Sequence, residues 1–206
     1  MKNLYFHKDL TLNGNTFISV DALLGYTKIY SANIYSFLSD WFNGDDFVSV
    51  RTSGSTGKPK NILLKKEYMV NSAQATGAFF DLPNRTKALL CLSPNYIAGK
   101  MMLVRALTLG WHLDIIVPDA NPLKDIKQDY DFSAMVPLQV YHSIDKLAHV
   151  KKLIIGGGAV SKELEAMLQS ISTEVYATYG MTETITHIAV KKLNNFENVI
   201  LSAVER

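Results

Sequence analysis

From Phe47 onward, short runs of apolar and β-branched residues alternate with stretches of helical periodicity. This alternation predicts βα units, because a crossover helix returns the next strand parallel to the one before it. The strand-like runs cover 47–51, 61–64, 87–91, 112–117, 133–136, 153–155, 174–177 and 185–190. The helix-like stretches cover 67–80, 100–109, 139–147 and 162–169, with Ser161 as the N-cap of the last. The pattern therefore predicts an α/β fold with a mostly parallel sheet flanked by helices.

Size and composition agree with a folded chain that has no disulfide or metal staple. The chain has 206 residues, 48% of them hydrophobic, and a chain of this length buries about 70% of the surface that its unfolded form exposes. Cys91 is the single cysteine, so no internal disulfide and no cysteine-based zinc site can form, and a reducing compartment is indicated. We expect Cys91 to be a small buried hydrophobe rather than a reactive thiol, since nothing near it in the sequence supplies a base.

The charge pattern argues against nucleic acid and membrane as partners. The net charge is +2, without the concentrated basic face of a nucleic-acid surface, and the lysine pairs at 65–66, 151–152 and 191–192 are predicted to be solvated ends of elements. No charge-free run is long enough for a membrane helix, and Lys8 and Asp9 interrupt the place of a signal peptide. A cytoplasmic protein is therefore predicted. The histidines have no metal-ligand spacing; they are His7, His112, His142, His149 and His187.

A loop rich in hydroxyls, glycine and lysine follows the first predicted strand. Its sequence is Thr52-Ser53-Gly54-Ser55-Thr56-Gly57-Lys58-Pro59-Lys60. Glycines let successive backbone N–H groups converge on anionic oxygens, while hydroxyls and lysines add donors and charge, so the segment suits a polyphosphate. It is not a Walker A loop, because Pro59 follows Lys58 and a strand-like run comes next instead of a helix. The alternative is a flexible Ser/Gly hairpin connection.

Two more loops after predicted strands carry unusual sequence. Gly156-Gly157-Gly158 follows 153–155 and allows a flat ring or a substrate to approach bare backbone, although a strained connection explains it equally well on its own. Tyr179-Gly180-Met181-Thr182-Glu183-Thr184 follows 174–177. Tyr179 offers a face for a purine, and Thr182 and Glu183 offer hard oxygens for Mg²⁺. Because ligands of open α/β sheets bind beyond the carboxyl ends of strands, the three loops are expected to share one site.

Together the loops resemble the signatures of the adenylate-forming superfamily, which includes acyl-CoA synthetases and peptide-synthetase adenylation domains. TSGSTGKPK is similar to its phosphate loop and YGMTE to its adenine and magnesium motif. The resemblance implies that residues 52–60 embrace the β- and γ-phosphates of ATP and that Gly156 to Gly158 line the adenine and acyl pocket. It further implies that Tyr179 stacks on adenine, with Gly180 and Met181 beside it, and that Thr182 and Glu183 hold the α-phosphate and Mg²⁺. Lys60, Thr182 and Glu183 would be the catalytic residues.

The reaction that this resemblance implies joins a carboxylate to ATP, forms an acyl-adenylate and then transfers the acyl group to coenzyme A. Only 51 residues precede Thr52, and in this short N-terminal stretch the chain resembles the o-succinylbenzoate–CoA ligases of menaquinone biosynthesis. The segment from Ser93 to Met102 is also similar to their acid-binding segment, with tyrosine at position 96 where many relatives have histidine. Tyr96, Gly99 and Lys100 are accordingly candidates for binding the acid, the lysine through a second carboxylate. The alternatives are core packing for Tyr96 and a solvated position for Lys100.

Three functions stay open at this point: an o-succinylbenzoate ligase, a ligase for another aryl or fatty acid, and a nucleotide-binding module without turnover. The superfamily continues after its YGMTE motif with a ribose-binding aspartate, a hinge and a small C-terminal domain that bears a lysine. None of these can be placed in the 23 residues after Glu183. Residues 1–206 are therefore predicted to be a partial N-terminal adenylation domain that ends in a helix-like stretch over 195–206. The oligomeric state is left open.

Overall fold

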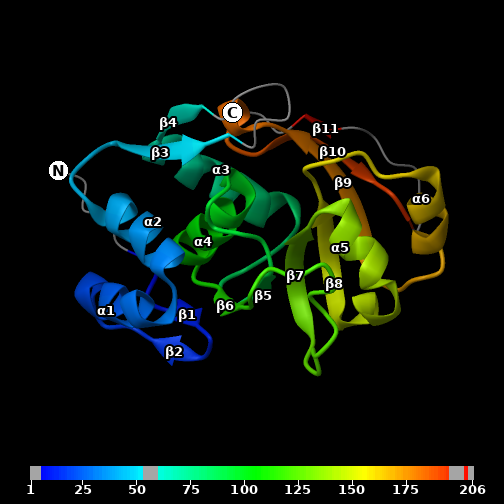
Figure 1. Cartoon of the computed structure of the whole chain (residues 1–206), viewed down its shortest axis with the longest axis horizontal. Coiled ribbons are helices and arrows are strands. Elements are labelled where there is room, and N and C mark those ends of the chain that lie inside the picture. The colour runs from blue at the N-terminus through cyan, green and yellow to red at the C-terminus, as the bar shows by residue number, and fades with distance from the viewer. Residues whose placement is uncertain (1–5, 53–59, 195–201, 204–206) are drawn as a thin grey trace.

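A nine-stranded sheet forms the centre of the molecule in the computed structural model, which describes residues 6–52, 60–194 and 202–203 (Figure 1). The strand order is β11-β10-β9-β8-β7-β5-β6-β1-β2, and neighbours from β9 to β1 pair in parallel. Both ends of the sheet are antiparallel. The strands are β1 (Thr11–Leu12), β2 (Asn15–Thr16), β5 (Lys87–Leu90), β6 (His112–Ile115), β7 (Tyr130–Met135), β8 (Val150–Ile155), β9 (Glu174–Gly180), β10 (His187–Lys192) and β11 (Ser202–Ala203).

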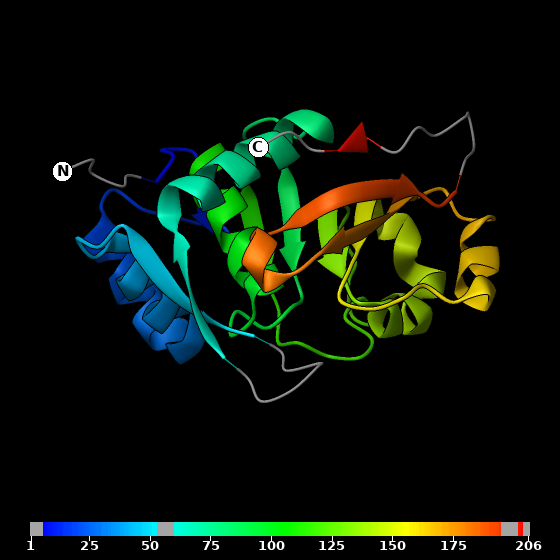
Figure 2. The same ribbon diagram turned by 90° about the horizontal axis from the view of Figure 1, so that it is seen from above.

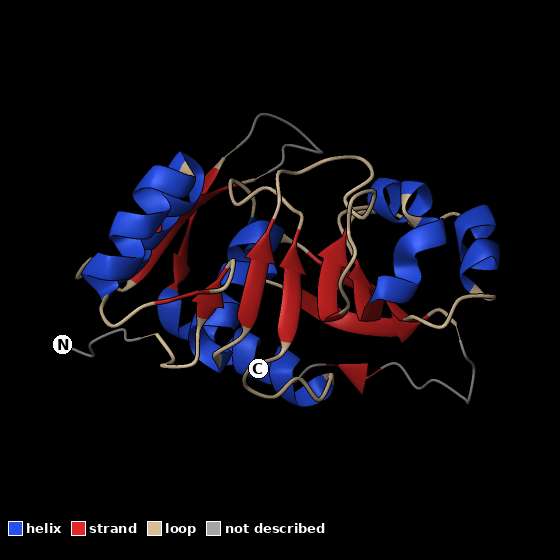
Figure 3. Ribbon diagram, turned by 90° about the horizontal axis from the view of Figure 1, so that it is seen from below, coloured by secondary structure: helices blue, strands red, loops and turns tan. Residues whose placement is uncertain are grey.

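Helices cover both faces of this sheet (Figure 3). Successive residues of a strand point to opposite faces, so neighbouring residues of one strand lie in different cores. On one face, Ala88 and Leu90 of β5 share a hydrophobic core with α3 and α4. On the other face, Leu89 lies in a second core with the helices that follow β7 and β8. The covering helices are α3 (Lys66–Phe79), α4 (Ile97–Leu109), α5 (Pro137–His142), the 3₁₀ helix η1 (Ile144–His149) and α6 (Lys162–Leu168). The predicted α/β class with a mostly parallel sheet is confirmed.

The N-terminal part adds two helices and a hairpin that stands apart from the main sheet. Helices α1 (Val20–Tyr30) and α2 (Ala32–Phe42) begin at the serine N-caps Ser19 and Ser31. Strands β3 (Phe47–Arg51) and β4 (Asn61–Lys65) pair only with each other, as an antiparallel two-stranded sheet. The alternation from Phe47 onward suggested that both would belong to the parallel sheet. That expectation was wrong, because a hairpin reverses the chain and leaves no crossover helix between its strands.

Other element boundaries also differ from the sequence-based expectation. The helix predicted over 139–147 is broken at Ser143 into α5 and η1. The helix-like stretch at the C-terminus was wrong where the structure describes it, since Ser202–Ala203 forms strand β11 against β10. Lys66 is not solvated: it is buried and its Nζ donates to Asn43 Oδ1 at 2.7 Å. Cys91 is buried as predicted, and burial raises the pKa of its thiol to about 12. In the described parts, no helix is both long and apolar enough to cross a membrane.

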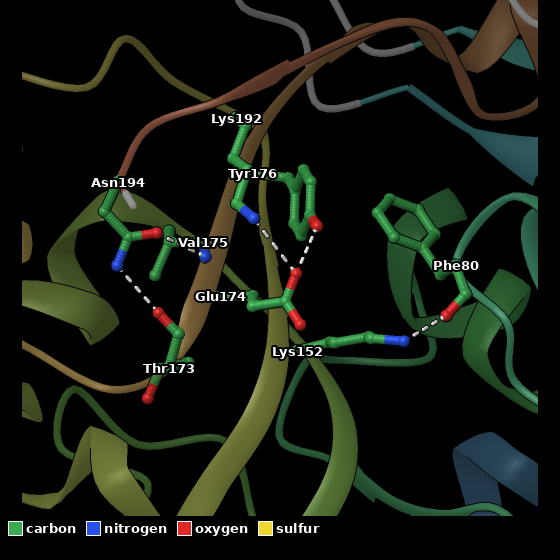
Figure 4. A network of polar contacts seen from close by, with 8 residues as sticks. All are labelled: Phe80, Lys152, Thr173, Glu174, Val175, Tyr176, Lys192 and Asn194. Carbon is green, nitrogen blue, oxygen red and sulfur yellow. Dashed lines mark hydrogen bonds and ion pairs between the residues drawn. The ribbon is translucent and has the colours of Figure 1, made fainter. Parts of the chain in front are cut away.

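A polar network fixes the chain where β9 begins and β10 ends (Figure 4). Asn194 is fully buried, and its side chain accepts from Val175 N at 2.9 Å and donates to the carbonyls of Thr173 and Leu168 at 2.7 and 3.1 Å. An amide group that satisfies three buried backbone groups takes the place of a strand partner there. Asn194 therefore fixes the position from which β9 runs to the candidate site.

The same network contains Glu174, whose Oε2 accepts from the Tyr176 hydroxyl at 2.6 Å and from Lys192 Nζ at 3.2 Å (Figure 4). The hydrogen bond from Tyr176, together with the charge of Lys192, lowers the pKa of Glu174. A folded-state pKa below the unfolded one stabilises the protein at neutral pH, and this stabilisation is lost as the pH falls. Because Glu174 is partly exposed, we expect Glu174→Gln to lower the free energy of unfolding by only about 0.5–1 kcal/mol at pH 7.

Urea unfolding at several pH values measures this effect. The difference between wild type and Glu174→Gln should shrink from about pH 5 downward, because the wild-type carboxylate then takes up a proton. Glu163→Gln, at an exposed position in the first turn of α6, is the matched control and should change stability by at most a few tenths of a kcal/mol. A pH-independent difference at position 174 would contradict the assigned role of the charge.

Candidate functional site

Segments that carry predicted site residues meet at one edge of the sheet. Strands β5, β8 and β9 run parallel in the same sheet, so the chain that follows each of them leaves from the same edge (Figure 3). Tyr96 follows β5, Gly156 to Gly158 follow β8, and Tyr179 to Thr184 lie at the end of β9 and just beyond it. Gln139 links neighbouring chain segments there, since its Nε2 donates to the carbonyls of Cys91 and Asp119, each at 3.0 Å.

The glycine segment lies directly beside β9. The Thr178 hydroxyl donates to the carbonyl of Ile155 at 3.0 Å, and a Cβ on Gly156 would lie 3.0 Å from that hydroxyl oxygen. Gly157 has a φ of +76°, the left-handed region that glycine adopts without strain. Gly157 and Gly158 are exposed. The structure thus joins two of the predicted site segments through Thr178, which sequence reasoning did not single out.

Tyr179 and Gly180 belong to β9 and not to the loop in which the sequence placed them. Pairing with β10 extends the strand to the Gly180–His187 pair. A Cβ on Gly180 would overlap the carbonyl oxygen of Thr186 and lie 2.7 Å from its carbon, so glycine is needed here for the close approach of the two strands. The Tyr179 side chain is 63% exposed, which leaves its ring free to meet a ligand.

Between β9 and β10 the chain forms a short, internally bonded turn. Thr182–Thr184 is the 3₁₀ helix η2, and the Thr184 hydroxyl accepts from Met181 N at 3.0 Å, with the carbonyls of Met181 and Thr186 each 2.9 Å away. Ile185 has φ +70° and ψ −50°, and Thr186 N donates to the Thr184 carbonyl at 2.8 Å. These values define a γ-turn of the rare, strained type, which is unusual for a β-branched residue. The strand predicted over 185–190 therefore begins only at His187.

Glu183 and Met181 of this turn are exposed, and Thr182 is partly buried. Among the described residues, no group of three or more His, Cys, Asp or Glu side chains is arranged to hold a metal. The turn nevertheless presents one carboxylate and one hydroxyl side by side. Mg²⁺ bound together with a nucleotide takes one or two carboxylates from the protein and its other ligands from phosphate and water. The donor set therefore fits a magnesium ion that arrives with a nucleotide.

The hydroxyl-rich loop connects β3 and β4, as in a hairpin. Thr52 N donates to the Lys60 carbonyl at 2.9 Å, and Lys60 N donates to Thr52 Oγ1 at 3.0 Å, so the two ends of the loop are tied together. The predicted phosphate-binding residues between them lie outside the described residues; these are Ser53, Gly54, Ser55, Thr56, Gly57 and Lys58. Strand β4 contacts η2, and Figure 2 shows the hairpin facing the turn between β9 and β10. Lys60, which is exposed, is the residue directly before that strand.

The three residues predicted to bind the acid occupy very different environments. Tyr96 is the N-cap of α4 and is 49% exposed, which rules out core packing. Gly99 is buried, and a Cβ there would overlap the carbonyl oxygen of Ser93, so it allows α4 to pack closely against the preceding turn. Lys100 is only 9% exposed, and the alternative of a solvated lysine is wrong. Its Nζ lies 4.6 Å from the centre of the Phe37 ring, and burial lowers its pKa.

Arg105 is a candidate functional residue that the sequence reasoning missed. Its side chain is buried in α4, and its Nη2 donates at 3.0 Å to Oγ1 of Thr186, the last residue of the γ-turn. No carboxylate pairs with it among the described residues, and its Nε has no hydrogen-bond partner. The available signal was a charged residue within the apolar helical run MMLVRALTL.

A cavity of about 210 Å³ lies at the opposite edge of the sheet, among residues that precede β5 or begin β7 and β8. Both of its lysines already have partners: Lys151 pairs with Asp131 at 2.7 Å, and Lys152 Nζ donates to the Phe80 carbonyl at 2.7 Å (Figure 4). Ligands of parallel sheets bind at the carboxyl ends of strands. We therefore place the candidate site at the edge that carries the three segments, not at this cavity.

A family model described as "AMP-binding enzyme" matches residues 40–201. The chain belongs to this family. A solved acyl-CoA synthetase (AMP-forming)/AMP-acid ligase II-like protein from Dyadobacter fermentans is 40% identical, with a TM-score of 0.75 over 82% of this chain and 50% of its own. The 2-succinylbenzoate–CoA ligase of Escherichia coli is 25% identical over 150 residues, which are 72% of this chain and 33% of the relative.

A solved o-succinylbenzoate–CoA synthetase from Bacillus subtilis, in complex with ATP and magnesium, shares the fold of this AMP-binding chain. Its TM-score is 0.64 at 16% identity, over 85% of this chain and 45% of its own. The AMP-binding chain spans about a third of the length of the E. coli ligase and half of the D. fermentans protein. It is therefore distantly related to the 2-succinylbenzoate–CoA ligases through part of their length.

Proposed function

We propose that this chain is the ATP- and acid-binding portion of an AMP-forming acid–CoA ligase. One observation carries the proposal: the segments that bear Tyr96, the three glycines and the Tyr179–Thr184 motif meet at the carboxyl edge of the parallel sheet, and the β3–β4 hairpin contacts the turn after β9. A phosphate loop and a magnesium carboxylate must lie close together to bind one nucleotide. The contact between β4 and η2 is what such a site requires.

In this proposal, residues 52–60 surround the β- and γ-phosphates of ATP, and Lys60 provides positive charge beside them. Tyr179 stacks on adenine from the exposed face of β9, with Gly180 and Met181 next to it, and Gly156 to Gly158 line the pocket from β8. The bare backbone of the exposed glycines lets a flat ring approach closely. Thr182 contacts the α-phosphate, and Glu183 holds the magnesium ion that accompanies the nucleotide.

The proposed chemistry has two steps. A carboxylate oxygen of the acid attacks the α-phosphorus of ATP, and the bond from that phosphorus to the bridging oxygen breaks, so that acyl-adenylate forms and pyrophosphate leaves. The thiolate sulfur of coenzyme A then attacks the acyl carbon and AMP leaves. A carboxylic acid is already ionised at neutral pH, so the first step needs no general base. The contribution of this chain is to position the reactants and to stabilise charge on the departing pyrophosphate.

The proposed acid is o-succinylbenzoate. Support comes from the E. coli ligase named for this substrate and from the exposed Tyr96, whose ring can cover an aromatic acid. Another aryl or fatty acid is the second candidate. Gly99 packs α4 against Ser93, and Lys100 lies over Phe37, so Tyr96 is the residue of the three that we assign to direct contact.

Calorimetric titration with stable acyl sulfamoyl adenosines tests the proposal without requiring turnover. We expect the succinylbenzoyl compound to bind at least about tenfold more tightly than the benzoyl and long-chain compounds, a difference of about 1.4 kcal/mol. Equal affinities would support the nucleotide site and contradict o-succinylbenzoate as the acid. Failure of all three compounds to bind to the folded chain would contradict the proposed site itself.

A further inference from the structure

Arg105 presents an unusual energetic problem within α4. Its guanidinium is buried, with only 2% of the residue exposed, and no carboxylate pairs with it among the described residues. Burial lowers its pKa to about 10, so it stays charged at neutral pH. An unpaired buried charge destabilises the folded state. Such a cost is tolerated where the charge has a function, and the only oxygen that the guanidinium reaches in the described structure is the Thr186 hydroxyl.

Thr186 is the last residue of the strained γ-turn between β9 and β10. Its N–H closes the γ-turn by donating to the Thr184 carbonyl at 2.8 Å, and Ile185 between them has the unfavourable φ of +70°. Strained backbone of this kind persists only when neighbouring contacts hold it in place. On the side of β9, the close approach at Gly180 supplies such a contact. On the side of α4, Arg105 supplies the other.

The direction of the hydrogen bonds makes this contact specific. Arginine can only donate, so the Thr186 oxygen accepts from Nη2 at 3.0 Å and its own proton is free to point to His187 Nδ1 at 3.2 Å. Burial and the nearby charge of Arg105 lower the pKa of His187 to about 3. The imidazole is therefore neutral and can accept this proton. A chain of polar groups thus leads from α4 through Thr186 to the first residue of β10.

We propose that Arg105 is a positioning residue that, through the Thr186 hydroxyl, holds the Met181–Thr186 turn in the conformation that presents Thr182 and Glu183 to the nucleotide. The proposal rests on the function proposed above. It assigns to Arg105 no contact with ATP or with the acid. Loss of the hydrogen bond between Arg105 and Thr186 should therefore slow adenylate formation without weakening the binding of the acid.

Two substitutions each remove one partner of the Arg105–Thr186 hydrogen bond, and a third preserves the bond. Thr186→Val keeps the shape of the side chain but removes the hydroxyl, and Arg105→Met keeps much of the length but removes the donor. Thr186→Ser retains the hydroxyl and is the matched control. The first readout is amide hydrogen exchange in the chain itself. We expect the protection of the Ile185 and Thr186 amides to fall at least about tenfold in the valine and methionine variants, with the central amides of β8 unchanged.

The second readout is ATP–pyrophosphate exchange by the enzyme that carries this chain. Thr186→Val and Arg105→Met should each lower kcat by about tenfold to hundredfold, since displacement of a catalytic group by about 1 Å can have that effect. The KM for the acid should be unchanged. The double variant should be no slower than the slower single variant, because both remove one interaction. Thr186→Ser should retain the wild-type rate.

Three results would contradict the positioning role of Arg105. Unchanged amide protection and kcat in Thr186→Val would show that the hydroxyl holds nothing. A raised KM for the acid with unchanged kcat in Arg105→Met would instead show that the guanidinium contacts the substrate. Multiplying effects in the double variant would show that the two residues act independently. If the wild type catalyses no pyrophosphate exchange with any of the acids tested, the proposed function fails. The amide-exchange result then still decides whether the Arg105–Thr186 contact holds the turn.

Discussion

Replacing Lys60 or Glu183 with alanine is expected to lower the rate of acyl-adenylate formation by at least about tenfold in the proposed ligase. Each side chain stabilises charge that develops on the phosphates in the proposed reaction, and one such preorganised group contributes about 3 kcal/mol to catalysis. Both side chains are exposed, so neither substitution removes packing. The rate is measured as ATP–pyrophosphate exchange, and the stability as the midpoint of urea unfolding.

Matched controls separate this effect from a general loss of surface charge. Lys65→Ala removes a lysine at the other end of β4, where its Nζ pairs with Glu67 at 2.9 Å, and Glu163→Ala removes an exposed carboxylate from α6. Both control variants should exchange pyrophosphate at the wild-type rate. Wild-type rates in Lys60→Ala and Glu183→Ala would refute the roles assigned to these two residues. Unfolding midpoints should stay near that of the wild type in all four variants.

The second large effect is expected for Gly180→Ala, which should lower the free energy of unfolding by about 3 kcal/mol, at the upper end of the usual cost of overpacking. The added Cβ would overlap the Thr186 carbonyl and lie 2.8 Å from His187 Cα. All these atoms belong to the backbone, so no side chain can rotate away. The ends of β9 and β10 must separate instead, and the turn that bears Thr182 and Glu183 must move with them.

Gly25→Ala provides the control for the glycine substitution. A Cβ on Gly25 would meet nothing within 4 Å, and alanine favours the helix by about 0.5–1 kcal/mol over glycine. This variant should therefore be slightly more stable than the wild type. Thermal and urea unfolding measure both effects, and calorimetry with an acyl sulfamoyl adenosine shows whether Gly180→Ala also loses affinity. Wild-type stability in Gly180→Ala would show that the two strands are not in close contact there.

Much of this protein could be predicted from local sequence. The periods of the apolar residues and the N-cap at Ser161 are local signals, and the structure confirms the elements that they mark. The α/β class followed from the order of those elements. The family also followed from contiguous motifs, because TSGSTGKPK and YGMTE contain their chemical groups within a few residues. Signals of this kind need no knowledge of which segments meet in space.

Tertiary structure decided what depends on contacts between distant segments. It separated the β3–β4 hairpin from the main sheet, since the pairing of strands, and not their apolar content, defines a sheet. It extended β9 through Tyr179 and Gly180 because β10 pairs with it there. It buried Lys66 against Asn43 and Lys100 over Phe37. It also brought Arg105 to Thr186, 81 residues away along the chain, because the environment of a charged side chain is set by the neighbours that folding places around it.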